Sequence, residues 1–162
     1  MQEHGLKISE LVTLFNLEVL NRGSDYDTAL LTITDVNRPG LQFHSFYDYF
    51  DPRRLQVLGK AEITYLKGLT TEQRRKCFDD LFLYDIPALV ISRGLDCFPE
   101  CLESARVHER TLLRTEETTV EFTSHTIEYL NRVLAPCVTR HGVLLDISGE
   151  GVMITGDSGI GK

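Results

Sequence analysis

The seven residues at the end of the sequence have the types and spacing of a phosphate-binding loop. They satisfy the pattern G-x-x-x-x-G-K and directly follow the apolar run VMIT at 152–155. Glycines let consecutive backbone N–H groups curl around an anion, and a lysine ammonium adds positive charge at the terminal phosphates. The alternative is a glycine-rich surface turn, but the apolar strand in front favours nucleotide binding. We predict that the phosphates are bound by Gly156, Asp157, Ser158, Gly159, Ile160, Gly161 and Lys162.

The sequence ends at the lysine of this pattern. In a complete loop a Ser or Thr follows that binds magnesium, and then a helix whose N-terminal amides face the phosphates. Phosphoryl transfer depends on several such groups acting together. We therefore expect a truncated phosphate loop that binds ATP poorly and a chain that has no kinase activity alone.

One histidine precedes the loop, in the run Thr139-Arg140-His141-Gly142. Its side chain titrates near neutral pH, so it suits a role beside a reacting phosphate or a nucleophile. The alternative is a structural histidine on a strand, and the residues alone leave both open.

The four cysteines are Cys77, Cys97, Cys101 and Cys137, and no two of them form a C-x-x-C pair. Zinc sites and dithiol redox centres usually contain such pairs. Cys97, Cys101 and His108 could meet around a metal, but a fourth ligand is not apparent. We therefore predict reduced, structural thiols and assign no metal ligand.

Length and charge limit the number of domains and the kinds of binding partner that this chain can have. A chain of 162 residues with 42% apolar composition can form one full core and the beginning of a second. The net charge of −7 argues against a nucleic-acid partner. No apolar run is long enough for a signal peptide or a membrane span, so we expect a cytoplasmic protein without a membrane partner.

Apolar spacing and turn residues predict the elements that position these residues. Helices are expected over 7–15, 51–58, 70–83, 97–110 and 118–134, the last with Val120, Ile127, Leu130 and Leu134 on its buried face. Strands are expected over 17–21, 29–36, 61–66, 86–92, 112–116, 137–148 and 152–155.

This order predicts an α/β fold, with a small mixed or parallel sheet and flanking helices. Pro136 marks the boundary between residues 1–134, an N-terminal regulatory or assembly domain, and residues 135–162, the first strands and truncated phosphate loop of a kinase domain. Arg38, in the run Asn37-Arg38-Pro39-Gly40, either binds an anion or pairs with a carboxylate, and the sequence does not decide between them. The aromatic residues Phe43, Phe46, Tyr47, Tyr49 and Phe50 favour packing over a pocket.

Two long segments resemble one enzyme family. Residues 139–162, TRHGVLLDISGEGVMITGDSGIGK, look like the start of the kinase domain of HPr kinase/phosphorylase enzymes, in which a His-Gly-Val-Leu stretch precedes the phosphate loop. Residues 37–66 resemble that family's Arg-Pro-Gly and Gln-Val-Leu-Gly segments. Together the resemblance spans nearly the whole chain.

The resemblance implies a bifunctional, cytoplasmic regulator of bacterial carbon metabolism. Such enzymes phosphorylate a serine of the phosphocarrier protein HPr with ATP and Mg²⁺, remove it with inorganic phosphate, and form hexamers. By resemblance, the loop residues 156–162 would bind nucleotide, and His141 and Lys162 would be catalytic. The carboxylate that acts as base and the acidic metal ligand of the family have no match in this sequence.

Two other interpretations stay open: a ligand-sensing or assembly module without catalysis, and the start of another P-loop NTPase. In all three, the apolar residues of 143–154 would normally lie in a sheet covered by helices. We expect them to be disordered or to pair with another copy when they are left bare.

Overall fold

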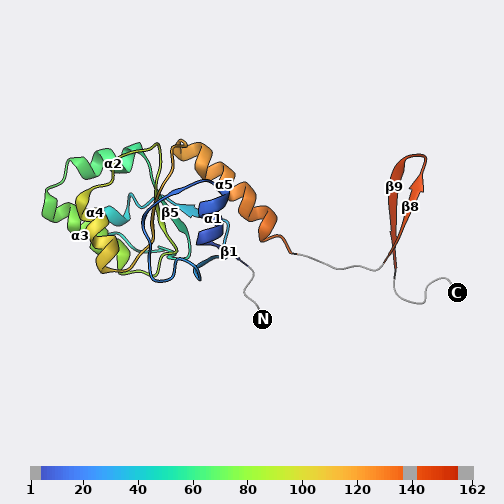
Figure 1. Ribbon diagram of the computed structural model, residues 1–162, viewed down its shortest axis with the longest axis horizontal. Helices are drawn as coiled ribbons and strands as arrows, with labels where there is room; N and C mark the ends of the chain where they lie inside the picture. The colour runs from blue at the N-terminus through green and yellow to red at the C-terminus, as the bar shows by residue number, and fades with distance from the viewer. Residues whose placement is uncertain (1–4, 137–141, 157–162) are drawn as a thin grey trace.

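The computed structural model describes residues 5–136 and 142–156, and its main body is a five-stranded mixed sheet between two layers of helices (Figure 1). In order across the sheet, the strands are β2 (Glu18–Asn21), β7 (Leu112–Arg114), β6 (Leu89–Ile91), β5 (Leu55–Leu58) and β4 (Val36–Asn37). The last four are parallel to one another, and β2 is an antiparallel edge strand. The predicted α/β fold with a mixed sheet is confirmed.

The helices cover both faces of this sheet (Figure 1). One face packs against α2 (Lys60–Lys67), α3 (Thr71–Phe82), α4 (Pro99–Val107) and the short helix η1 (Gln42–His44). The other packs against α1 (Ile8–Leu14) and α5 (Thr119–Val133), next to the small antiparallel pair β1 (Leu6–Lys7) and β3 (Leu30–Leu31). Because these central strands are buried on both faces, β6 is apolar throughout, and β5 and β7 each contain only one polar residue, Gln56 and Arg114.

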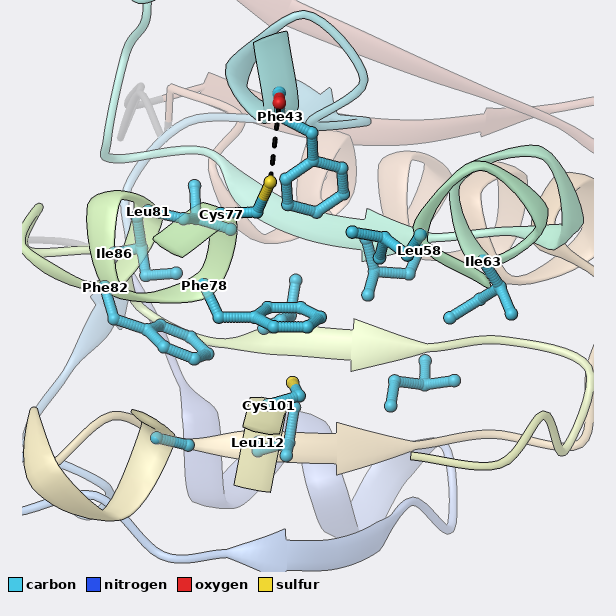
Figure 2. Close-up of a cluster of buried hydrophobic side chains, with 14 residues drawn as sticks. Phe43, Leu58, Ile63, Cys77, Phe78, Leu81, Phe82, Ile86, Cys101 and Leu112 are labelled. Atoms are coloured by element: carbon cyan, nitrogen blue, oxygen red, sulfur yellow. Dashed lines mark hydrogen bonds between the residues drawn. The ribbon is translucent and has the colours of Figure 1, made fainter. Parts of the chain in front are cut away.

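The core on the α2–α4 face is built around phenylalanine rings (Figure 2). Phe78 packs edge-on against Phe43 and stacks on Phe82. The Cys77 thiol donates to the Phe43 carbonyl at 3.4 Å, which ties η1 to α3. Burial of a large apolar side chain contributes roughly 1.5–3 kcal/mol, so this cluster is a main source of stability.

Two helices begin with threonine caps. Thr70 caps α3 and Thr118 caps α5, each accepting a bond from the backbone N–H three residues on, at 3.2 and 3.3 Å. The predicted helices 7–15, 70–83, 97–110 and 118–134 and the strands at 17–21, 86–92 and 112–116 are all present with shorter ends.

Two neighbouring predictions are wrong. The expected helix over 51–58 is a turn followed by β5, because the Asp51 carboxylate accepts from the Arg53 backbone N–H at 3.0 Å and the chain then enters the sheet. The expected strand over 61–66 is α2, which begins after Gly59 with Ile63 and Leu66 on its buried side. The expected strand over 29–36 is also interrupted, because only the short strands β3 and β4 form there. On α5, the predicted core residue Val120 is 71% exposed, and the core side is formed by Phe122, Thr126 and Leu130.

The described C-terminal residues form a separate antiparallel hairpin of β8 (Gly142–Ile147) and β9 (Glu150–Thr155). Its turn, Ser148-Gly149, has φ values of 58° and 86°, as a type I′ hairpin requires. The Asp146 carboxylate accepts from the Gly149 N–H at 2.8 Å and holds this turn.

Candidate functional site

The predicted phosphate loop is placed by the strand that leads into it. Gly156 follows β9 immediately, is exposed, and has no heavy atom within 4 Å of the position a Cβ would take. The strand-then-glycine context that strengthened the motif is therefore present. Asp157 to Lys162 and His141 lie outside the described residues, so their predicted roles stay predictions.

The hairpin that carries Gly156 has two apolar faces. Its pairs Val143–Ile154 and Leu145–Val152 lie on one face, and Leu144–Met153 lies on the other. The side chains of these six residues are 40–73% exposed, although each is large and apolar. Strands with apolar residues on both faces are typical of a sheet interior, and an isolated two-stranded hairpin is only marginally stable in water.

The possible metal cluster does not form. The described residues contain no group of three or more His, Cys, Asp and Glu side chains that could hold a metal ion. The Cys97 thiol donates to the Phe98 carbonyl at 3.4 Å, whereas His108 Nε2 lies 3.2 Å from Asp79 Oδ1. Burial raises the pKa of the Cys101 thiol, as expected of a structural cysteine.

A second candidate site lies where the parallel strands end. Arg38 follows β4, Lys60 lies two residues after β5, Arg93 two residues after β6, and Thr119 opens the helix after β7. They line a shallow cleft of about 500 Å³, together with Ala61, Thr64 and Val120. In open α/β sheets, ligands bind outside the carboxyl ends of the strands.

Sequence reasoning missed this cleft because its residues are far apart in the chain. The sequence contains only a partial signal for the cleft. Arg38 is a possible anion ligand, and the Arg-Pro-Gly and Gln-Val-Leu-Gly segments, which end at Gly40 and Gly59, both lie beside the cleft. The sheet brings Arg38 and Gly59 together, because β4 and β5 are parallel neighbours.

Arg38 pairs with a neighbouring carboxylate: its Nη2 donates to Glu62 Oε2 at 2.8 Å. The same carboxylate oxygen accepts from the Gly59 N–H at 2.8 Å. Burial raises the pKa of Glu62, but the bonds from Arg38 and from the backbone outweigh that effect and hold the pKa below its ordinary value of 4.5. Glu62 is therefore an anion that fixes both Arg38 and the start of α2.

Close packing shapes the base of the cleft. A Cβ on Gly59 would lie 2.7 Å from Thr119 Oγ1 and 3.0 Å from Arg38 Nη2, so only glycine fits there. Thr119 is buried, and its hydroxyl lies 2.7 Å from the hydroxyl of Ser92 at the end of β6. Ser92 Oγ also donates to the Leu58 carbonyl at 2.9 Å, so Ser92 links the start of α5 to the end of β5, next to Gly59.

Arg93 is held in an uncommon backbone conformation. Its φ is 65°, and the next residue, Gly94, has a φ of 58°. The N–H groups of these residues donate to the carbonyls of Glu117 and Thr115 at 2.8 Å each, which fixes the turn between β6 and α4. Left-handed non-glycine residues cost about 1–3 kcal/mol and occur often at ligand sites.

Within residues 5–136 and 142–156, none of the helices combines the length and apolarity needed to cross a membrane.

Comparison with known proteins gives consistent matches. The profile of the family described as "HPr Serine kinase N terminus" matches residues 6–130. Relatives named HPr kinase/phosphorylase include one from Alkaliphilus metalliredigens, 45% identical over 97% of this chain and 50% of its own length, and one from Clostridium beijerinckii, 44% identical over 98% of this chain and 52% of its own. The chain thus spans about half the length of the curated relatives it matches.

A solved structure shares the fold at low sequence identity. It contains the CBS and DRTGG domains of the regulatory region of Clostridium perfringens pyrophosphatase, complexed with diadenosine tetraphosphate. The likeness has a TM-score of 0.52 at 15% identity and covers 76% of this chain and 47% of the other.

Proposed function

The chain belongs to the HPr serine kinase N-terminus family, and from this we propose that it is part of a bifunctional HPr kinase/phosphorylase. Such an enzyme transfers a phosphoryl group from ATP to a serine of HPr and removes it again with inorganic phosphate. The observation that carries the proposal is the end of β9: an apolar strand leads directly into Gly156, the first residue of the G-x-x-x-x-G-K pattern.

The proposed roles divide between the loop and the histidine. Residues 156–162 hold the nucleotide phosphates through backbone N–H groups, and the Lys162 ammonium stabilises charge on the transferred group. His141 lies one residue before β8, and we assign it a place near the reacting phosphate. Bound ATP supplies the phosphoryl group, and Mg²⁺ neutralises charge on its oxygens.

The hairpin supports this assignment through its exposed surface. Both of its faces carry large apolar side chains, as expected of strands that belong inside a larger covered sheet. We propose that β8 and β9 belong to the kinase domain, and that the residues covering them lie in the half of the relatives that this chain does not match. Metal ligands and the catalytic base are assigned to that half as well.

The family also suggests the setting of the activity. We propose HPr as the protein substrate, a hexamer as the assembly of the whole enzyme, and the bacterial cytoplasm as its location, in the control of carbon metabolism. The chain alone is proposed to be inactive, because it lacks groups that must act together with the loop.

The test uses a chimera that joins residues 1–162 to the second half of the Alkaliphilus metalliredigens relative. Each protein is incubated with HPr, ATP and Mg²⁺, and phosphoserine on HPr is measured by mass spectrometry. We expect the chimera to phosphorylate HPr, its His141→Ala variant to do so at least about 100-fold more slowly, and the chain alone to give none. Stoichiometric phosphoserine from the chain alone would refute its inactivity, and a folded chimera without activity would count against the kinase assignment.

A further inference from the structure

The cleft at the carboxyl ends of β4, β5, β6 and β7 is a separate site from the phosphate loop. Three cationic side chains, Arg38, Lys60 and Arg93, meet there although 22 and 33 residues separate them along the chain. Among the described residues, neither Lys60 nor Arg93 has a carboxylate within ion-pair distance. Two cations are therefore available on a chain whose net charge is −7.

Two carboxylates beside the cleft are held by hydrogen bonds. Glu62 accepts from Arg38 and from the Gly59 N–H. Glu121 accepts from both the hydroxyl and the N–H of Thr118, at 2.7 and 3.1 Å, within the cap of α5. The residues that line the cleft include three cations and no carboxylate, so the cleft has an excess of positive charge.

Two helices also begin at the cleft. The first intrahelical bond of α2 comes from the N–H of Ile63, and that of α5 from the N–H of Phe122. The N–H groups of the two residues that open each helix therefore have no helical acceptor. Those residues are Lys60 and Ala61 in α2 and Thr119 and Val120 in α5, and all four line the cleft.

From this juxtaposition we propose that the cleft binds a small molecule that carries a phosphate group. The phosphate lies between the two helix starts, where it accepts from the free amides and pairs with Lys60 and Arg93. Arg38 keeps its bond to Glu62 through Nη2 and offers the remaining N–H groups of its guanidinium, since its side chain is 48% exposed.

The rest of the cleft suits the uncharged part of such a ligand. Val120, which sequence analysis placed on a buried face, is 71% exposed at the cleft and supplies an apolar contact. The volume of about 500 Å³ lies within the range of small-molecule sites. The site is built from residues 38–122, so it does not depend on the proposed kinase activity.

The test is an NMR titration of the ¹⁵N-labelled chain with sodium pyrophosphate, glucose 6-phosphate and glucose at constant ionic strength. We expect saturable shifts of the Gly59, Lys60, Ala61 and Thr119 amides with one or both phosphate compounds and none with glucose. A response to pyrophosphate only identifies a free inorganic anion as ligand, and a response to glucose 6-phosphate identifies a phosphate ester. No saturable shift with either, or equal shifts with sodium chloride, would overturn the proposal.

Charge-removing variants test whether the cleft itself holds the phosphate. Lys60→Gln and Arg93→Gly are expected to weaken binding about 10-fold or more, because each removes a charged partner. Lys67→Gln makes the same charge change at the far end of α2 and is expected to leave affinity unchanged. Lys162→Ala alters the phosphate loop, and loss of the cleft shifts in that variant would show that the ligand binds at the loop instead. Unchanged affinity in both Lys60→Gln and Arg93→Gly would also refute the proposal.

Discussion

At the scale of single residues, the cleft is organised by Glu62, whose carboxylate binds both Arg38 and the start of α2. Glu62 is 9% exposed, so its charge is stable there because of these bonds. Arg93, in contrast, has an unfavourable left-handed backbone conformation, which is held in place by the hydrogen bonds of its own N–H and that of Gly94.

Glu62→Gln should make the protein less stable in a pH-dependent way. Since the folded pKa of Glu62 lies below its ordinary value of 4.5, its contribution is present above about pH 4.5 and is lost as the pH falls through the folded pKa. Urea unfolding is expected to show a loss of roughly 1–3 kcal/mol at pH 7, and a smaller difference from the parent protein below pH 4. A difference that stays constant between pH 7 and pH 3 would contradict this role.

Arg93→Gly should raise the free energy of unfolding by about 0.5–1 kcal/mol. Glycine removes the left-handed strain, although its greater freedom in the unfolded chain offsets part of the gain. Arg106→Gly, an exposed arginine inside α4, is the matched control and should lose about 1 kcal/mol. Equal destabilisation of both variants in denaturant titrations would show that residue 93 is not strained.

At the scale of elements, α3 and α4 are joined by a buried ion pair. Arg74 Nη2 lies 3.1 Å from Glu100 Oε1, with side chains 15% and 7% exposed, and Arg74 also donates to the carbonyls of Leu66 and Leu69. Its guanidinium lies over the ring of Phe98, 4.7 Å from the centroid. These contacts fix the start of α4 against the end of α2.

Arg74→Met should cost about 3–5 kcal/mol of unfolding free energy, because Glu100 would be left buried without its partner. The adjacent Arg75 pairs with Glu103 across the same helices but in solvent, so Arg75→Met should cost at most about 1 kcal/mol. Thermal and urea unfolding of the two variants measure the difference. Similar losses of unfolding free energy in the two variants would mean that burial does not determine how much the Arg74–Glu100 pair contributes to stability.

Sequence reasoning succeeded for elements with unambiguous ends. The helices expected from residues 70 and 118 form with Thr70 and Thr118 as their caps, and the apolar segment 86–92 forms the central strand β6. It failed where local and tertiary preferences compete. LQVL at 55–58 is short and apolar enough for a helix or a strand, and burial on both faces of the sheet makes it a strand. The segment 61–66 contains β-branched residues that favour a strand, but it forms a helix whose start is capped by Glu62.

The phosphate loop could be predicted from the sequence, but the cleft at the strand ends could not, because it depends on tertiary structure. A phosphate loop is contiguous, so its pattern is visible in the sequence. The cleft is built from residues that follow four different strands, and only the strand order brings Arg38, Lys60, Arg93 and Thr119 together. Glu62, the partner of Arg38, has no sequence signal because the two lie 24 residues apart.

At the scale of the whole molecule, the chain contains a well-packed α/β unit and a hairpin with no buried residue. The two differ in what stabilises them. The five-stranded sheet is covered by helices on both faces, whereas the apolar faces of β8 and β9 are exposed.

Hydrogen exchange should reveal this difference. In the chain alone, amides of 142–156 are expected to exchange at least about 100-fold faster than those of β5 and β6, because local opening of an uncovered hairpin costs little free energy. In the chimera with the second half of the Alkaliphilus relative, the same amides should become protected while β5 and β6 stay unchanged. Strong protection of the hairpin in the monomeric chain would show that it needs no cover.

We propose that Lys162 belongs to the nucleotide-phosphate site of an HPr serine kinase. The most direct measurement is the initial rate of HPr serine phosphorylation by the chimera with ATP and Mg²⁺, comparing Lys162→Met with Lys67→Met, which removes an exposed lysine of α2. We predict that Lys162→Met lowers the rate by at least about 1000-fold, since the charge on the transferred group loses its partner, and that Lys67→Met leaves it within about twofold. Equal rates for the two folded variants would contradict this role of Lys162.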